Sequence, residues 1–421
     1  MRFRSRLPSS PSASGVGQVE LKRSISLPLL TFYGIGTILG AGIYVLVGKV
    51  AGSAGMHAPV AFLVASLLAA FSAFSYAELA SRFPLSAGEA VYVQQGLGRR
   101  HLSLLVGLFI VTMGTVSCAT MIHGFVGYLG VFFDLPRLPV MVAMVLVLGA
   151  VAVWGIGESV WLASAITVIE LFGLLLVLWV SRGVWDDLPA HAPQLMPGWD
   201  GSAWLGVLLG AFLAFYAFIG FEDIVNVAEE VRGAPRNVPR AVLLALVTTT
   251  VLYLAVATAS VLAVSPAALS ASDAPLALVY ERATGQAPTA IAVISLFSVI
   301  NGALIQLIMG SRVLYGLSSQ GWLPRILARV SPRTRTPVVA TVFVMALILG
   351  FALWLPLVTL ARATSFVTLI VFSLINLALW RIKRRGPAEA GVFEVPRWVP
   401  VGGFVASLGF LIFQALQAWR G

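Results

Sequence analysis

The sequence has few charged residues and almost no cysteine. Only 10% of its 421 residues are Asp, Glu, Lys or Arg, against about 25% in soluble domains. The single cysteine, Cys118, excludes an intramolecular disulfide framework and a cysteine-rich metal site. The four histidines do not have the spacing of metal ligands. Together with 59% apolar residues, these scarcities indicate a polytopic membrane protein that needs neither disulfides nor metal.

Eleven apolar segments are long enough to cross a bilayer, whose hydrocarbon core takes about 20 helical residues. These predicted spans are 27–50, 58–81, 102–131, 139–156, 160–181, 203–228, 238–264, 286–318, 337–356, 358–381 and 398–418. An odd number of spans places the two termini on opposite sides of the membrane.

Basic residues are distributed unevenly over the predicted topology. With the N-terminus inside, 21 of the 27 Lys and Arg residues fall in inner segments and six in outer ones. This bias predicts a cell-membrane protein with a cytoplasmic N-terminus. The net charge of +10 therefore reflects topology, and the scattered basic residues do not form one face for nucleic acid. Residues 1–24 are rich in Ser, Pro and Arg and are expected to be a disordered cytoplasmic arm without a secretory signal, with an organellar transit peptide as the alternative.

The first span carries an unusual number of glycines. Residues 31–48 read TFYGIGTILGAGIYVLVG, and each of the five glycines costs a helix about 1 kcal/mol relative to alanine. We interpret Gly40-Ala41-Gly42 as an interruption whose free backbone groups bind a ligand. One alternative is close helix packing through Gly36-x-x-x-Gly40. The other, a dinucleotide fingerprint, is disfavoured by its spacing and by the lack of a preceding strand.

A second interruption is predicted in the sixth span. It begins as AWLGVLLGAFLAFYAFIGF and turns polar at Glu222, directly after Gly220 and Phe221. Interrupted helices five spans apart are typical of inverted repeats that bind substrate at the breaks. We therefore predict an all-α polytopic membrane protein with inverted five-helix repeats, a 5+5 core in which helices 1 and 6 are broken. The repeats are expected at 25–185 and 186–385, with an additional C-terminal helix in 386–421.

Four motifs in matching order resemble the amino acid–polyamine–organocation (APC) transporter superfamily. They are GIGTILGAGIYVLVG in the first span, SYAELASRFPLSAGEAVYV at 75–93, FIGFEDIVNVAEEVRGAPRNVPRA at 218–241 and GSRVLYGLSSQGWLP at 310–324. The resemblance covers about residues 25–415 and implies a permease with a ten-helix core of two inverted repeats plus extra helices. Many members of that superfamily have twelve spans, whereas this chain has eleven predicted ones.

A binding mode for an amino acid follows from the two breaks. The N–H groups of the half-helix that starts at Gly40–Gly42 would meet the carboxylate, aided by the helix dipole. Carbonyl oxygens near Thr37, Ile38, Phe218 and Ile219 would meet the ammonium group. The predicted substrate-binding residues are Thr37, Ile38, Gly40, Ala41, Gly42, Ile43, Phe215, Phe218, Ile219 and Gly220.

Acidic residues at membrane depth are functional by default. Glu170 lies midway along the fifth span, at a position where the resemblance implies a lysine in several relatives. It is a candidate proton carrier, and Asn301 is its candidate partner. The alternative is a structural carboxyl that is satisfied by a neighbouring helix. Four further acids are gating candidates, with a structural role as the alternative: Glu78, Glu222, Glu229 and Glu230. His123, alone in the third span, is interpreted as a satisfied core residue.

These observations predict a secondary transporter that moves amino acids by alternating access, coupled to protons or acting as an exchanger. Two alternatives remain open: a polyamine or other organic amine transporter, and a sensor that keeps the fold but does not translocate. We expect no enzyme, because no nucleophile–base pair is visible. We also expect no cofactor, no metal and no nucleic acid, with an amino acid or amine, a proton and membrane lipid as partners.

Overall fold

The protein is described by a computed structural model for residue 23 and residues 25–40, 42–84, 88–154, 160–319, 321–334, 336–388 and 391–420. It is helical almost throughout. Within the described residues, extended pairing is limited to an isolated parallel bridge between Ile25 and Val231. The predicted disorder of residues 1–24 falls almost entirely outside the described residues.

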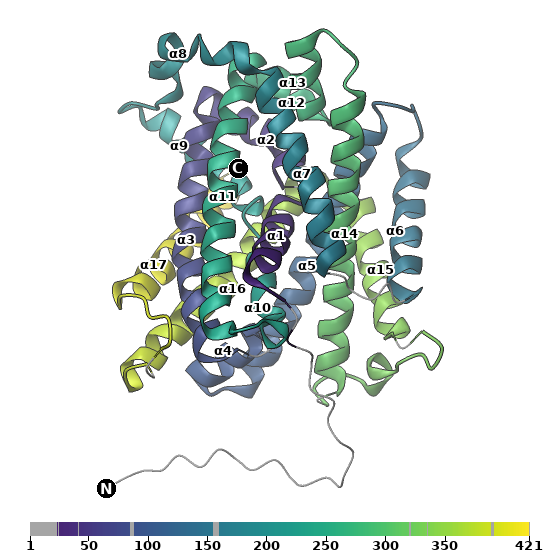
Figure 1. Cartoon of the computed structure of the whole chain (residues 1–421), viewed down its shortest axis with the longest axis vertical. Coiled ribbons are helices and arrows are strands. Elements are labelled where there is room, and N and C mark those ends of the chain that lie inside the picture. Colours follow the sequence, from purple (N-terminus) through teal and green to yellow (C-terminus); the bar gives the residue numbers. More distant parts are fainter. Residues whose placement is uncertain are drawn as a thin grey trace, which may run out of the picture.

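Long helices stand side by side and form one bundle (Figure 1). The helices that make up this bundle are α1 (Leu27–Leu39), α2 (Gly42–Ala54), α3 (Ala58–Arg82), α5 (Arg100–Leu129), α6 (Arg137–Trp154), α7 (Val160–Val180), α9 (Gly201–Tyr216), α11 (Ala234–Ala263), α14 (Thr289–Ser319), α15 (Val338–Trp354), α16 (Leu357–Arg385) and α17 (Trp398–Arg420). Shorter helices lie between them: α4 (Gly88–Leu97), α8 (Leu188–Leu195), α10 (Asp223–Asn226), α12 (Pro266–Ala271) and α13 (Pro275–Thr284).

The described helices include six segments that are long and apolar enough to cross a membrane, and four shorter apolar helices. The first of the six covers Leu27–Arg82 and so contains α1, α2 and α3. An all-α polytopic membrane protein is therefore confirmed, while the count of eleven spans stays a prediction. The predicted span 27–50 corresponds to two helices, α1 and α2, as expected for a span interrupted at Gly40-Ala41-Gly42.

Local sequence signals explain where several helices begin. Proline lies in the first turn of α1, α3 and α11, where its missing N–H costs nothing. The carboxylate of Asp200 caps α9 by accepting from the backbone N–H groups of Ser202 and Ala203. The bundle is then held by long helix pairs, most extensively α5 with α14 and α11 with α3.

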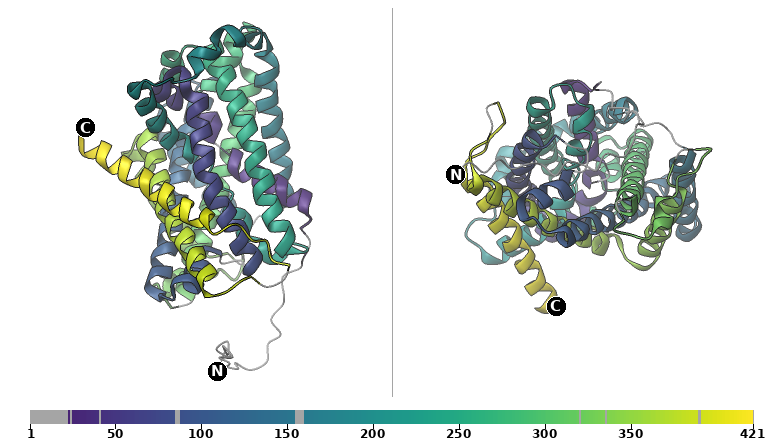
Figure 2. Two further views of the ribbon diagram at one scale, coloured as in Figure 1. Left: turned by 90° about the vertical axis from the view of Figure 1, so that its left-hand side faces the viewer. Right: turned by 90° about the horizontal axis from the view of Figure 1, so that it is seen from below.

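Helix α17 leaves the bundle at an angle, and its C-terminal end lies away from the other helices (Figure 2). Four exposed apolar residues, Val401, Val405, Leu408 and Ile412, recur along it at helical spacing. Such a stripe is suited to contact with lipid, because lipid tails are as apolar as these side chains. The functional centre lies elsewhere, near α1, α2 and α9 in the middle of the bundle.

Candidate substrate site at two interrupted helices

The first interruption separates α1 from α2. Helix α1 ends at Leu39, and Gly40 adopts φ 23°, a conformation that favours glycine. The N–H of Gly40 still donates to the carbonyl of Gly36 at 3.0 Å, and the next helix starts at Gly42. The predicted break in the first span is therefore present, although Ala41 lies outside the described residues.

The second interruption separates α9 from α10. Helix α9 ends at Tyr216, residues 217–222 form turns, and α10 starts at Asp223. Gly220 in this segment has φ 128°, and a Cβ atom there would lie 2.3 Å from the carbonyl oxygen of Thr37. Only glycine therefore fits at position 220, both by conformation and by space.

The two interruptions touch each other. The hydroxyl of Thr37 donates to the carbonyl oxygens of Gly34 and Gly220, at 3.0 and 2.9 Å. A Cβ atom on Gly42 would lie 2.5 Å from the Cα of Ala217, so the start of α2 is in direct backbone contact with the second break. Helices that are far apart in sequence thus bring their free backbone groups to one place.

Tyr253 of α11 binds both breaks, and sequence reasoning missed it. Its hydroxyl lies 2.9 Å from the carbonyl oxygen of Ile38 and 2.9 Å from that of Ala217. A single hydroxyl proton serves two acceptors, one in each interrupted helix. The ring is buried against Phe218, with 5.1 Å between ring centroids. Backbone carbonyls at membrane depth need such partners, and the tyrosine in the apolar run TTTVLYLAVA is the one visible sequence signal.

A small cavity lies at the junction of the breaks. Its lining consists of Thr37, Ile38, Gly40, Gly42, Ser117, Met121, Tyr216, Ile219 and Gln306. The volume open to the centre of a water molecule is about 10 Å³, enough for one water and too small for an amino acid. The site is therefore closed in this structure, and a substrate needs the surrounding helices to move apart.

The lining contains half of the residues predicted to bind substrate. Thr37, Ile38, Gly40, Gly42 and Ile219 line the cavity, whereas Gly220 forms the joint just described. Of the others that the structure describes, Ile43, Phe215 and Phe218 do not line it and are buried in the surrounding core. Phe215, for example, packs edge-on against Phe372 of α16 at 5.9 Å.

Four lining residues were not predicted from the sequence: Ser117, Met121, Tyr216 and Gln306. Three of them come from α5 and α14, the pair of helices that face the breaks. The hydroxyl of Tyr216 lies 3.0 Å from that of Ser117 and donates to the Ser117 carbonyl at 3.1 Å. Gln306 gave a weak signal as a polar residue in the apolar run SLFSVINGALIQLI, where a structural role was the alternative. Ser117, Met121 and Tyr216 gave none, because position on a distant helix is not visible in local sequence.

Glu170 of α7 is completely buried next to the first break. The amide of Asn301 donates to its Oε1 at 3.3 Å, so the predicted partner is in place. Ser298, a neighbour of this carboxyl, donates its hydroxyl to the carbonyl of Gly40. The hydroxyl of Tyr44 donates to the backbone carbonyl of Glu170 at 2.5 Å. No basic side chain pairs with Glu170 among the described residues.

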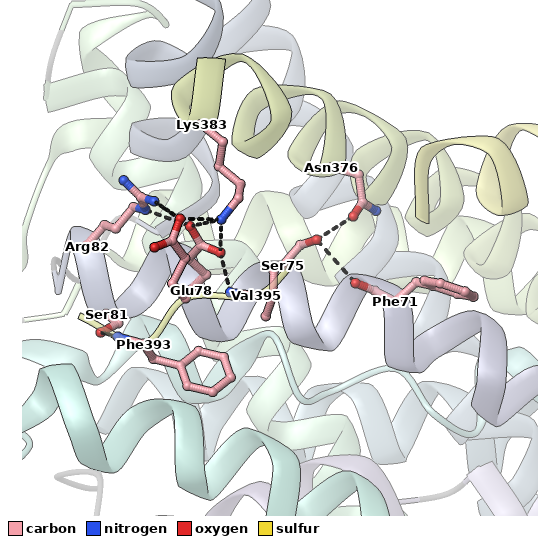
Figure 3. Close-up of polar contacts among 10 residues, drawn as sticks. Phe71, Ser75, Glu78, Ser81, Arg82, Asn376, Lys383, Phe393 and Val395 are labelled. Carbon is pink, nitrogen blue, oxygen red and sulfur yellow. Dashed lines mark hydrogen bonds and ion pairs between the residues drawn. The ribbon is translucent and has the colours of Figure 1, made fainter. Parts of the chain in front are cut away.

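Glu78, predicted to act in gating, is the centre of an ionic cluster at the ends of α3 and α16 (Figure 3). Its carboxylate accepts from Arg82 at 2.6 and 2.8 Å and from Lys383 at 2.9 Å to each oxygen. It also accepts from the backbone N–H of Val395 at 2.8 Å. Lys383 in turn pairs with Glu394 at 2.9 Å. The segment that joins α16 to α17 is thus fastened to α3.

The remaining gating candidates lie apart from Glu78. Glu222 is buried, and its Oε2 accepts from the N–H of Gly220 at 2.9 Å, so it supports the second break directly. Glu230 holds the segment that leads into α1, because its backbone carbonyl accepts from the N–H of Ile25 at 3.0 Å. The side chain of Glu229 lies outside the described side chains.

Two further polar residues lie near these elements. Glu89, at the start of α4, was not predicted, and burial raises its pKa to about 8, with Glu222 adding to the effect. His123 places Nε2 at 3.0 and 3.1 Å from the carbonyl oxygens of Ala352 and Leu355 at the end of α15. His123 therefore caps a neighbouring helix, in agreement with its interpretation as a satisfied core residue.

Comparisons with known proteins find similarity to amino acid permeases and other transporters. A family model described as amino acid permease matches residues 25–418. The chain is 29% identical over 442 aligned residues to the branched-chain amino acid permease BcaP of Bacillus subtilis, covering 99% of this chain and 92% of the relative. It is 33% identical to an uncharacterized transporter of Mycobacterium tuberculosis, covering 85% and 80%. It is 28% identical to the vacuolar cationic amino acid transporter 2 of Arabidopsis thaliana, covering 88% and 61%.

Proposed function

Since the chain belongs to the amino acid permease family, we propose that it moves amino acids by alternating access around the two interrupted helices. The observation that carries this proposal is the meeting of both breaks at one closed cavity, joined by Thr37 and Tyr253. Transporters place their substrates where interrupted helices offer free backbone groups at the membrane midplane.

The amino acid is held by backbone groups in this proposal. The N–H groups at the start of α2 bind the carboxylate, because they have no partner within their own helix and lie at its positive end. The ammonium group binds carbonyl oxygens at the ends of α1 and α9. The carbonyls of Ile38 and Gly220 already accept hydroxyl groups, but a carbonyl oxygen has a second lone pair for the substrate.

Glu170 is the proposed site of proton coupling. It lies beside the first break, and within the described residues an amide is the hydrogen-bonding partner of its carboxyl. A proton on this carboxyl removes an uncompensated charge from membrane depth, so protonation can be linked to the state of the adjacent break. An exchanger or facilitator would use the same breaks without this step.

The proposal includes an orientation and a division of the chain. The distribution of Lys and Arg supports a cell-membrane protein with a cytoplasmic N-terminus. The two breaks support one five-helix repeat in 25–185 and an inverted second one in 186–385, followed by the C-terminal helix. Polyamine transport, or binding without transport, remains an outcome of the experiment.

The test is uptake into proteoliposomes with an alkaline lumen, using labelled amino acids and putrescine. We expect amino acid accumulation above equilibrium with the pH gradient, and equilibration only in its absence. Glu170→Gln should keep exchange of internal for external amino acid and lose gradient-driven accumulation. Glu281→Gln, at an exposed glutamate of α13, is the matched control and should behave as wild type. Unchanged accumulation in Glu170→Gln contradicts the coupling role, and binding without uptake contradicts transport.

A further inference from the structure

Gln306 of α14 is a buried amide that faces the cavity without a partner. It is 7% exposed and belongs to the cavity lining. Within the described residues its side chain makes no hydrogen bond, although it carries two donors and an acceptor. The cavity is where its two donors and one acceptor can find a partner, either a ligand or water.

Other polar side chains of the lining are already paired. Thr37 donates to two backbone carbonyls, and the hydroxyls of Ser117 and Tyr216 bind each other. Gln306 is therefore the side chain of the described lining whose hydrogen-bonding capacity is unused. Unlike Thr37, it does not join the two breaks by a hydrogen bond.

Gln306 belongs to a wall built by two helices. On α5, Gly114, Ser117 and Met121 share one face by helical spacing, and on α14 Gly302 and Gln306 lie one turn apart. A Cβ atom on Gly114 would lie 3.1 Å from Oε1 of Gln306, so a larger residue at 114 would press on this amide. A Cβ atom on Gly302 would lie 3.0 Å from the Sδ of Met121. Gly114 thus leaves space for the amide of Gln306, and Gly302 leaves space for the thioether of Met121.

The lining also lacks charge. Among its described residues there is no Asp, Glu, Lys, Arg or His. A cationic side chain in this cavity would lose its hydration and would find no counter-charge among these lining residues. An aliphatic side chain would fit the thioether of Met121 but would leave the Gln306 amide unpaired.

We propose that Gln306 is a specificity-determining residue that selects neutral amino acids whose side chains carry an amide or a hydroxyl group. This inference rests on the proposed function, because the α-carboxylate and ammonium groups are held at the two breaks. The substrate side chain then points to the wall of α5 and α14 and exchanges hydrogen bonds with the amide of Gln306. Both donor and acceptor side chains are satisfied, since an amide offers both groups.

The test is a comparison of labelled glutamine, threonine, leucine and lysine in proteoliposomes. Wild type should take up glutamine or threonine at least about ten-fold faster than leucine or lysine, since a site with a buried hydrogen-bonding group rejects substrates that leave it unpaired. Gln306→Leu should reverse the ratio of glutamine to leucine. Gln306→Glu, of the same shape, should admit lysine. Gln286→Leu, at an exposed glutamine between α13 and α14, is the matched control and should leave all ratios unchanged.

Each outcome decides between the two proposals. If wild type transports no amino acid under any gradient, the proposed function fails. If it transports leucine or lysine as fast as glutamine and threonine, the proposed function stands and the role of Gln306 is wrong. A Gln306→Leu protein with an unchanged ratio of glutamine to leucine also overturns the role. Should Gln306→Leu fail to fold, the wild-type ratios and the uptake of lysine by the isosteric Gln306→Glu variant decide the same question.

Discussion

Glu78 and Glu170 are both completely buried, yet their surroundings are opposite. Glu78 receives hydrogen bonds from a guanidinium group, an ammonium group and a backbone N–H (Figure 3). Glu170 receives one amide hydrogen bond, at 3.3 Å. The first carboxylate is compensated by two cations, and the second has no cation within the described residues.

This difference indicates a structural role for Glu78 and a role in conformational change for Glu170. A compensated carboxylate is costly to separate from its partners, so Glu78 holds α3, α16 and the segment around Val395 together. An uncompensated carboxyl gains from any cation or proton that reaches it, so its state can change during a transport cycle. Burial alone therefore does not tell the roles of two glutamates apart, whereas their partners do.

The largest expected effect is that of Glu78→Gln on stability. Among the described residues, Lys383, whose side chain is 3% exposed, would keep only the half-exposed Glu394 as an anionic partner. Loss of one member of a buried ion pair costs about 3–5 kcal/mol of unfolding free energy. The measurement is thermal unfolding in detergent. Unfolding is monitored by the rate at which a thiol reagent labels Cys118, which is buried and is the one cysteine of the chain.

A double variant controls this prediction. Glu78→Gln with Lys383→Met removes both the carboxylate and the ammonium group, so it should cost less than Glu78→Gln alone. If Glu78→Gln unfolds at the wild-type temperature, the cluster contributes nothing measurable, and the contrast with Glu170 disappears.

Glu170→Gln is expected to have a much smaller effect in the same assay. A glutamine keeps an oxygen for the amide of Asn301 and removes the charge, so the change in unfolding free energy should stay within about 1 kcal/mol. A rise in stability would agree with an uncompensated carboxyl. A loss as large as that of Glu78→Gln would mean that Glu170 has a structural partner of its own, and the comparison would be wrong.

Local sequence predicted the breaks well for a physical reason. Gly40 and Gly220 adopt positive φ, and glycine is the residue that supplies such angles, so an interrupted helix is visible where it occurs. The pairing of Glu170 with Asn301 was also expected, in this case from the resemblance to polar positions of the transporter superfamily rather than from local sequence. Helix ends followed hydropathy closely: the predicted span 337–356 corresponds to α15 at Val338–Trp354.

Contacts between distant helices were not predictable in this way. Tyr253 reaches both breaks from α11, and Gln306 reaches the cavity from α14, but the rotation of each helix is set by packing rather than by its own sequence. Lys383 lies just beyond the predicted span 358–381, where a solvated loop is expected, yet it is 4% exposed, because Glu78 and Glu394 both bind it. The substrate-binding roles of Ile43, Phe215 and Phe218 stay predictions without a place in the cavity lining.

The smallest effect is expected at Glu394, the outer partner in the Glu78 cluster. Its hydrogen bond from Lys383 holds the pKa of Glu394 below its usual 4.5, with Arg82 and Arg397 adding to the effect. A lowered pKa in the folded state means that this contact stabilises the protein above about pH 5 and is lost as the pH falls through the lowered pKa. Because the side chain is 47% exposed, Glu394→Gln should cost only about 0.5 kcal/mol or less near neutral pH.

Unfolding temperatures of wild type and Glu394→Gln, measured from pH 7 down to pH 4, test this expectation. The small difference between the two proteins should shrink as the pH falls, because protonated Glu394 and glutamine both lack the charge that Lys383 attracts. Glu281→Gln, at an exposed glutamate of α13, should follow wild type throughout. If Glu394→Gln costs as much as Glu78→Gln, then the exposed carboxylate rather than the buried one compensates Lys383, and Glu78 would resemble Glu170 more than its contacts indicate.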